Sequence, residues 1–312
     1  MQPETERLIR AAARGVSEIS TSERGLRLHR LPAKYAIYHD HDPLTQKVAD
    51  QLSGVRLALM TNATTVQLTY RSLRDAAVDG SFISPPSTVS LTYADQSQTI
   101  AHTDGDVRMW AGAESASVTI GQDSVATFAL TPTETPRLVD IWLPHNCHID
   151  IVDLTADQPL ASAERTTPKW VHYGSSISHC IEATEPIGVW PVIAARELGL
   201  DLCNLGLAGS ANIETFAAHA IAELEPDVVT LKLGINTVNG RHLTRRTFIP
   251  TVHAFLDVLR QSLPNAPILV ISPIFCDAHE HQPGPTLGGL DGTIAAADNS
   301  SPEWVGDRKS VV

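Results

Sequence analysis

The sequence predicts a protein of two parts, a β-sandwich followed by an α/β region, and three observations support this prediction. Short segments of alternating apolar and polar residues fill the first half, with no long helix between them. After about residue 165, apolar strands alternate with helical segments. Between the two parts, turns that contain proline interrupt every periodic pattern over Thr155–Lys169. A chain of 312 residues is long enough for each part to bury its own core.

The first half is predicted to form a sandwich of the jelly-roll type from short, half-buried strands. In one of them Val66, Leu68 and Tyr70 alternate with polar residues, which is typical of a strand with one buried face. A short helix is predicted at Arg7–Ile19, where apolar residues fall near helical spacing. The predicted strands are Arg56–Met60, Thr65–Ser72, Thr88–Tyr93, Ser117–Ile120, Val125–Thr131, Leu138–Leu143 and His148–Leu154.

The second half is predicted to form a parallel sheet that helices cover on both faces. Its predicted strands are continuous apolar runs, whereas the longest helical segment is amphipathic. Strands and helices alternate in the order Trp170–Tyr173, Gly188–Leu200, Leu202–Leu207, Ile213–Leu224, Val228–Leu233, Arg245–Leu263 and Ile268–Phe275, beginning and ending with a strand.

Composition and charge narrow the possible functions. The formal net charge of −12 argues against nucleic acid as a partner. No apolar run approaches the roughly 20 residues that a membrane-spanning helix needs, which argues against a membrane partner. The first residues contain no signal-peptide core. The four cysteines show neither a disulfide framework nor the spacing of a metal site, which indicates reduced thiols and a cytoplasmic location.

Three loops follow successive predicted strands and carry the residue types that acyl transfer needs. They are Gly174-Ser175-Ser176-Ile177, Asn204-Leu205-Gly206-Leu207-Ala208-Gly209-Ser210 and Leu233-Gly234-Ile235-Asn236-Thr237. Because ligands bind at the carboxyl ends of strands in open α/β sheets, these loops should converge on one edge. A serine hydroxyl, a glycine N–H and an asparagine amide would supply a nucleophile and an oxyanion hole there. Taken singly, each loop also fits an ordinary turn or helix cap.

The three loops resemble the first three sequence blocks of the SGNH, or GDSL, hydrolases. The resemblance covers about Lys169 to Phe275 and implies a flavodoxin-like, three-layer α/β/α domain. It implies that Ser176 is the nucleophile. It also implies that the N–H groups of Ser176 and Gly209 and the side-chain amide of Asn236 form the oxyanion hole. The resemblance implies neither a cofactor nor a metal.

The resemblance also suggests a division of the chain into two domains. Residues 166–312 are assigned to the hydrolase domain. Residues 1–165 resemble the amino-terminal, carbohydrate-binding-like sandwich of some two-domain members, although this match is far less specific.

The sequence departs from the family's pattern where the general base is expected. The family's last block, Asp-x-x-His, supplies this base and the residue that orients it. Asp291-Gly292-Thr293-Ile294 has isoleucine at the histidine position. His279 and His281 are alternative bases, but a solvated polar loop also explains them, and His179 either lines the pocket or ends a helix. Ser175 replaces the family's usual aspartate without removing a proposed catalytic group.

Two further segments lead to separate expectations. His39-Asp40-His41-Asp42 has the composition of a metal site, but a solvated loop is the preferred interpretation, so no metal is predicted. Residues 287–312 show no periodic pattern where a final strand and helix should stand, so the α/β domain is expected to be truncated. DNA that encodes residues 307–312 resembles the start of a common sequencing adapter. We therefore expect the natural gene to continue, and the chain as written to be poorly soluble and nearly inactive without the catalytic histidine.

Together these features predict a serine hydrolase that acts on ester bonds through an acyl-enzyme on Ser176. The substrate would be a small-molecule acyl ester or an acylated sugar, while the sequence leaves the particular ester and the oligomeric state open. One alternative is an acyltransferase that uses the same residues to pass the acyl group to a natural-product or sugar hydroxyl. Another is a catalytically inert glycan-binding protein whose sandwich binds carbohydrate.

Overall fold

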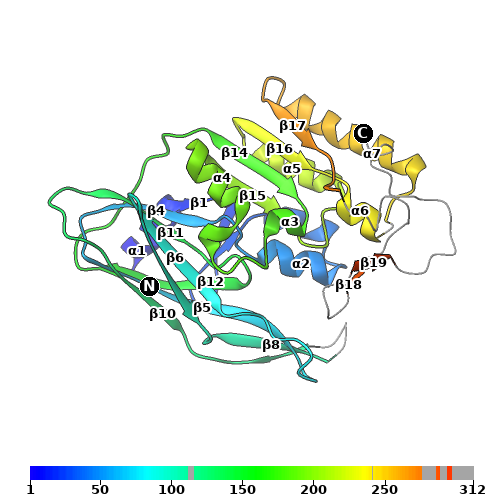
Figure 1. The fold of residues 1–312 in the computed structure, drawn as a ribbon. Helices are drawn as coiled ribbons and strands as arrows, with labels where there is room; N and C mark the ends of the chain where they lie inside the picture. Colours follow the sequence, from blue (N-terminus) through cyan, green and yellow to red (C-terminus); the bar gives the residue numbers. More distant parts are fainter. Residues whose placement is uncertain (112–115, 241, 276–285, 289–293, 297–312) are drawn as a thin grey trace.

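The computed structural model describes residues 1–111, 116–240, 242–275, 286–288 and 294–296 (Figure 1). Two sheets built from the first half lie face to face, and the second half forms a parallel sheet. A separate two-stranded sheet consists of β18 (Thr286–Gly288) and β19 (Ile294–Ala296).

The first half contains a six-stranded and a seven-stranded sheet. The pairs in the six-stranded sheet are antiparallel, and the seven-stranded sheet differs only in its parallel pair β5–β8. The six strands, in spatial order, are β1 (Ala13–Arg14), β4 (Arg56–Thr61), β11 (Arg137–Trp142), β6 (Ser87–Tyr93) and β7 (Gln96–His102), with β13 (Ala161–Ser162) beside β4. The seven are β2 (Glu18–Thr21), β3 (Leu26–His29), β12 (His148–Ala156), β5 (Thr65–Ala77), β8 (Asp106–Trp110) and β9 (Ala116–Thr119), with β10 (Ser124–Ala129) beside β5.

A single apolar cluster fills the space between these two sheets. Val66, Leu68 and Tyr70 of β5 are fully buried in it, as their alternation with polar residues predicts. They share the cluster with Leu57 of β4 and Val139 of β11, which come from the other sheet. The two sheets therefore form the layered arrangement that the sequence predicts, while the jelly-roll assignment stays a prediction.

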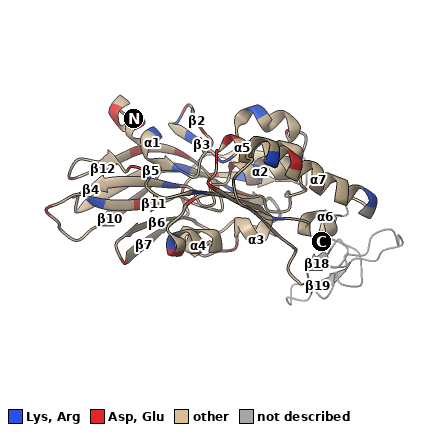
Figure 2. Ribbon diagram, turned by 90° about the horizontal axis from the view of Figure 1, so that it is seen from above, with Lys and Arg blue, Asp and Glu red and all other residues tan. Residues whose placement is uncertain are grey.

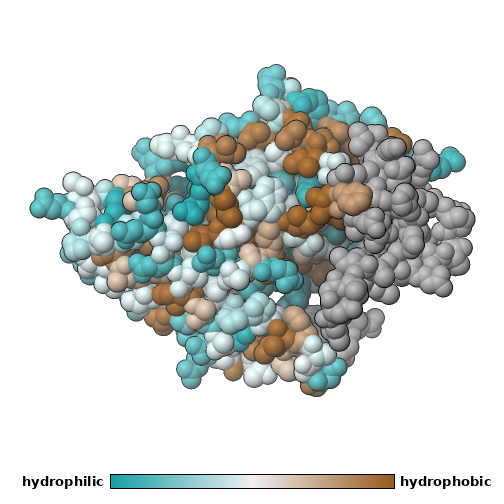
Figure 3. Space-filling view, viewed as in Figure 1, coloured by the Kyte–Doolittle hydropathy of each residue, from teal (hydrophilic) through white to brown (hydrophobic). Residues whose placement is uncertain are grey.

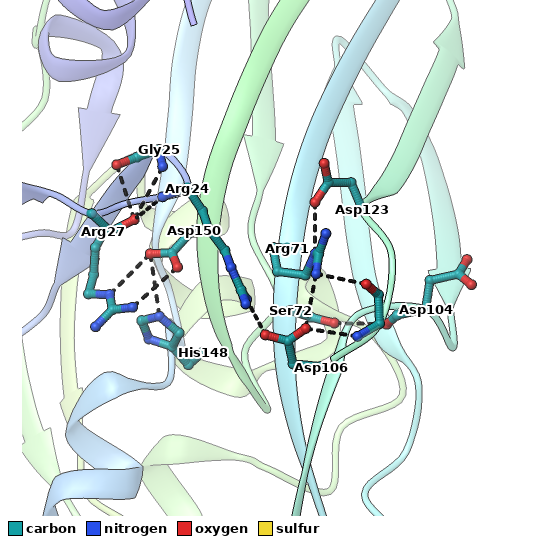
Figure 4. Close-up of polar contacts among 12 residues, drawn as sticks. Arg24, Gly25, Arg27, Arg71, Ser72, Asp104, Asp106, Asp123, His148 and Asp150 are labelled. Atoms are coloured by element: carbon teal, nitrogen blue, oxygen red, sulfur yellow. Dashed lines mark hydrogen bonds and ion pairs between the residues drawn. The ribbon is translucent and has the colours of Figure 1, made fainter. Parts of the chain in front are cut away.

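The opposite face of the seven-stranded sheet carries a row of ion pairs (Figure 4). Arg27 of β3 binds Asp150 of β12, with Nε and Oδ1 3.0 Å apart. Arg71 of β5 binds both Asp106 and Asp123, at 3.0 and 2.7 Å. Because each carboxylate has a guanidinium partner, the charges on this half-buried face are compensated. In the view of Figure 2, acidic and basic residues are interspersed along the coloured part of the ribbon.

The second half forms a four-stranded sheet in the order β15-β14-β16-β17, and every neighbouring pair is parallel. This order is flavodoxin-like, because the first strand of the set lies between the second and the third. Helices α5 and α7 share an apolar cluster with one face of the sheet, and α4 packs against the other face. The strands are β14 (Lys169–Gly174), β15 (Asp201–Gly206), β16 (Val228–Lys232) and β17 (Ile268–Ile271), and the helices are α3 (Ser176–His179), the 3₁₀ turn η2 (Pro186–Gly188), α4 (Trp190–Leu198), α5 (Thr215–Glu223), α6 (Ile235–Gly240) and α7 (Arg245–Ser262).

The first predicted helix is placed too far along the chain. Helix α1 spans Pro3–Ala12, with Pro3 in its first turn, where the missing proline N–H costs nothing. Ala13 is already extended, and β1 pairs with β4 there. The helix therefore ends because sheet pairing competes successfully with the weak helical pattern that follows. Strand β17 is likewise shorter than predicted, since it ends at Ile271 ahead of Pro273.

Two elements between β3 and β4 were not predicted, the 3₁₀ turn η1 (Ala33–Tyr38) and helix α2 (Pro43–Asp50). Tyr35 of η1 and Val48 of α2 are buried in the same cluster as Leu205 of β15. Residues early in the chain therefore complete the core under the parallel sheet. The domain boundary near residue 165 stays a prediction. Elements η1 and α2 come before that boundary in the sequence but pack against the part that follows it.

Candidate active site

The register of the parallel sheet brings the three loops to one edge. Gly174, the last residue of β14, is opposite Gly206, the last residue of β15. On the other side, Tyr173 of β14 is opposite Leu231 of β16. The loops that carry Ser176, Gly209 and Asn236 therefore leave the sheet at the same level, with the serine loop in the middle.

The first loop places two adjacent serines in different environments. Ser175 is fully buried and caps α3, with its Oγ accepting a hydrogen bond from the Ile177 N–H at 3.4 Å. Ser176 is the first residue of α3 and is exposed. The structure thus presents the hydroxyl of Ser176, rather than that of Ser175, at the edge of the sheet.

The second loop lies directly against the first. The N–H of Leu207 donates to the carbonyl of Gly174 at 2.7 Å. Gly206 has no room for a side chain, because a Cβ there would overlap the backbone nitrogen of His179 in α3. Gly209 is exposed and has a φ of +73°, a conformation that glycine adopts without strain. The chain can therefore turn sharply here and present its backbone N–H groups at the edge.

The third loop is tied to the second by Asn236. The side chain of Asn236 is buried, and its Oδ1 accepts a hydrogen bond from the Ala211 N–H at 3.1 Å. Because the oxygen takes this bond, the amide NH₂ group is the donor end of the side chain. The structure therefore brings the second and third loops into contact. The Asn236 oxygen makes this contact, and its NH₂ group is the proposed oxyanion donor.

A buried polar network under the first two loops was not found from the sequence. Asn204 of β15 donates from Nδ2 to Ser53 Oγ and to the carbonyl of Ser178, each at 2.9 Å. Ser53 Oγ donates in turn to the carbonyl of His179 at 2.7 Å. Arg30, which is almost fully buried, donates to the carbonyls of Asn204 and Gly206 at 2.8 and 2.9 Å. These bonds fix the turn that holds Ser176 against the end of β15.

The histidines described near this edge are engaged within the fold. His172 lies between Ser178 Oγ (2.7 Å from Nε2) and Thr230 Oγ1 (2.6 Å from Nδ1), and burial lowers its pKa to about 3. His179 donates from Nε2 to the carbonyl of His145 at 3.0 Å, and burial lowers its pKa well below the usual value. Among the described residues, no hydrogen bond joins Ser176 Oγ to a histidine. His179 is the last residue of α3, which agrees with the expectation that it ends a helix. Its ring is bound within the fold.

The other two histidines that the sequence offers as bases, His279 and His281, lie outside the described residues. So does most of the stretch from Asp291 to Ile294.

The segment His39-Asp40-His41-Asp42, which has the composition of a metal site, makes contacts within the fold. Asp42 caps α2, with Oδ1 accepting from the Leu44 N–H at 3.0 Å, and the ring of His39 packs 5.4 Å from that of Phe216. In the part of the chain that the structure describes, no group of three or more His, Cys, Asp or Glu residues could hold a metal ion. No helix in that part is long and apolar enough to cross a membrane.

Comparison with known proteins finds a family that the α/β part of the chain resembles. Residues 167–280 match the model of the GDSL-like Lipase/Acylhydrolase family. No curated protein sequence matches the chain.

Several solved structures share the fold. A salicylyl-acyltransferase, SsfX3, from a tetracycline biosynthetic pathway superimposes with a TM-score of 0.73 at 21% identity, over 90% of this chain and 73% of that one. A putative GDSL-like lipase from Bacteroides ovatus gives a TM-score of 0.60 at 18% identity, over 85% and 72% of the two chains. A family two carbohydrate esterase from Cellvibrio japonicus gives 0.55 at 12% identity, over 86% and 79%.

The two superpositions with the highest TM-scores extend over both halves of the chain, so its architecture as a whole recurs in known proteins. The parallel sheet, the helices on both its faces and the match of residues 167–280 agree with the fold that the sequence predicts for the second half. Residues 167–280 of the α/β part are therefore similar to the GDSL-like lipase/acylhydrolase family, as the sequence predicts.

Proposed function

We propose that this protein is a serine hydrolase that cleaves ester bonds through an acyl-enzyme on Ser176. The observation that carries the proposal is the exposed hydroxyl of Ser176 at the sheet edge shared with the loops of Gly209 and Asn236. The family match of residues 167–280 supports the same kind of chemistry.

In the proposed mechanism, Ser176 Oγ attacks the ester carbonyl carbon, and the carbonyl oxygen becomes an oxyanion. The N–H groups of Ser176 and Gly209 and the amide NH₂ of Asn236 donate to this oxygen as its charge develops. Collapse of the tetrahedral species expels the alcohol and leaves the acyl group on Ser176. Water then attacks the acyl-enzyme and releases the acid.

A general base must take the proton from Ser176 Oγ, since a serine hydroxyl is a weak nucleophile at neutral pH. His172 and His179 are held by hydrogen bonds within the fold, so we assign the role to neither. His279 and His281 are the remaining candidates that the sequence offers. Substituting each by glutamine and recording the pH dependence of kcat/KM tests them, because loss of the base removes the acidic limb of the profile.

The proposed substrates are small-molecule acyl esters and acylated sugars. The similarity in fold to a carbohydrate esterase from Cellvibrio japonicus supports the second class. A fluorophosphonate probe tests the proposal, because it should label the wild-type protein on Ser176 and leave Ser176→Ala unlabelled. Retention on a polysaccharide column without labelling or hydrolysis would instead favour the inert glycan-binding alternative.

Acyl transfer is the second candidate, because the superposition with the highest TM-score reported above is with a salicylyl-acyltransferase. The same acyl-enzyme would serve, with a hydroxyl acceptor in place of water. Supplying an alcohol acceptor together with the ester distinguishes the two reactions: a transferase yields mainly the new ester, and a hydrolase mainly the free acid.

A further inference from the structure

An apolar side chain from the first half of the chain lies beside the second loop. Leu44, in the first turn of α2, is close enough to Gly209 that a Cβ added there would lie 3.0 Å from Leu44 Cδ2. The residue is 48% exposed. Its side chain therefore stands at the surface next to a proposed oxyanion donor.

Helix α2 is held firmly at both ends, so the position of Leu44 is fixed by the fold. At the start, the Asp42 carboxylate accepts from the Leu44 N–H at 3.0 Å and from Thr45 Oγ1 at 2.5 Å. At the end, Arg30 donates to the carbonyls of Val48 and Gln51, where a positive charge also suits the helix dipole. The same guanidinium binds the carbonyls at the end of β15, so one side chain connects α2 to the strand that leads to Gly209.

We propose that Leu44 determines the specificity of the enzyme for the acyl group of its ester. This inference rests on the proposed function, in which the carbonyl oxygen of the substrate binds beside Gly209. The acyl chain and the alcohol oxygen are both attached to that carbonyl carbon, and we assign the side next to Leu44 to the acyl chain. An isobutyl group suits an aliphatic acyl chain better than the hydroxyl-rich alcohol of a sugar ester, and its bulk restricts the chain to short lengths.

The experiment compares kcat/KM for p-nitrophenyl esters of increasing acyl length in wild-type protein, Leu44→Ala and Leu44→Phe. Because one methylene in an apolar site changes discrimination by about 10-fold or more, the ratio of hexanoate to acetate should rise at least about tenfold in Leu44→Ala and fall in Leu44→Phe. Leu198→Ala is the matched control, since Leu198 is 69% exposed in α4, on the other face of the sheet, and its loss should leave the ratio unchanged.

Other outcomes would overturn the inference. An unchanged ratio in both Leu44 variants, or an equal loss of rate for every ester, would show that Leu44 only supports the loop. A shift that follows the alcohol in a series of acetate esters would place Leu44 on the leaving-group side. If Ser176→Ala retains wild-type hydrolysis, the proposed function fails instead, whatever the Leu44 variants show. Leu44→Val gives the same comparison, with a smaller effect, if Leu44→Ala does not fold.

Discussion

Ser175 and Ser176 are adjacent, yet only one of them can meet a substrate. Ser175 is buried under its own helix cap, whereas Ser176 is exposed at the sheet edge. In a protein whose general base is in place, we expect Ser176→Ala to lower kcat by as much as about 10⁶-fold, as loss of a serine nucleophile does elsewhere. Ser175→Ala should cost about 1 kcal/mol of stability through the lost cap and keep most of the activity. Ester hydrolysis and urea unfolding of both variants measure this, and inactivation by Ser175→Ala alone would contradict it.

Asn236 offers a test in which structure and chemistry can be separated. Its Oδ1 accepts from the Ala211 N–H, a bond that aspartate can also accept, whereas the amide NH₂ has no counterpart in aspartate. Both Asn236→Asp and Asn236→Ala should therefore lower kcat about 10²–10³-fold and change KM much less. Steady-state kinetics on a short acyl ester give both constants. If Asn236→Asp keeps wild-type kcat, the amide is not an oxyanion donor.

His172 links stability to pH. Burial, and next the charge of Lys232, lower the pKa of its imidazole to about 3, from an unfolded value of 6.5. Between these values the unfolded chain binds a proton that the folded protein does not, so the free energy of unfolding falls as the pH drops below 6.5. We expect this fall to be smaller in His172→Gln by roughly 2 kcal/mol between about pH 6.5 and pH 4.5.

Urea unfolding of both proteins at the two pH values provides the measurement. The comparison uses the change with pH, because the variant also alters the hydrogen bonds to Ser178 and Thr230 at every pH. Equal changes in the two proteins would mean that His172 titrates alike in the folded and unfolded states.

At the scale of elements, the loop after α2 supports the turn that carries Ser176. Removing the hydroxyl of Ser53 leaves the carbonyl of His179 without its donor and takes one acceptor from Asn204. An unsatisfied buried polar group costs about 1–3 kcal/mol, so Ser53→Ala should lower the free energy of unfolding by that amount. Because the turn loses its support, kcat should fall more than KM rises.

A control substitution of the same kind lies in an exposed turn. Ser81→Ala removes a hydroxyl that bonds only within that turn and should change stability by less than about 0.5 kcal/mol. Equal stabilities of Ser53→Ala and Ser81→Ala in urea would show that the network adds nothing to the turn.

The elements also show what could be predicted from the sequence. The parallel sheet and its three loops could be predicted, because each strand is a local apolar run that ends in glycine or small polar residues. Helix α2 was missed because it is short and follows His39-Asp40-His41-Asp42, although Asp42-Pro43 is a good start signal for a helix. The contacts of Arg30 could not be predicted, since its acceptors lie up to 176 positions away and are all backbone carbonyls. The side chains that complete the candidate site thus depend on tertiary packing that leaves no local pattern.

At the scale of the whole molecule, β17 is the most exposed apolar segment of the parallel sheet. In the described part of the chain it pairs only with β16, and its Leu269 and Val270 are 58% and 46% exposed. Apolar atoms gather at the surface over this end of the sheet (Figure 3). An open apolar strand edge favours pairing with another molecule, whereas the net charge of −12 opposes it by repulsion.

The salt concentration should therefore determine whether charge repulsion or pairing at the β17 edge dominates. Screening weakens the repulsion but not the apolar contact, so we expect self-association to increase as salt is added. Leu269→Lys places a charge on the edge and should keep the protein monomeric at the same salt concentration. Leu198→Lys, which changes an exposed leucine in α4, adds the same charge away from the edge and should leave most of the association in place. Sedimentation velocity over a series of protein and salt concentrations measures all three proteins. If the two lysine variants behave alike, net charge rather than the edge of β17 controls the association.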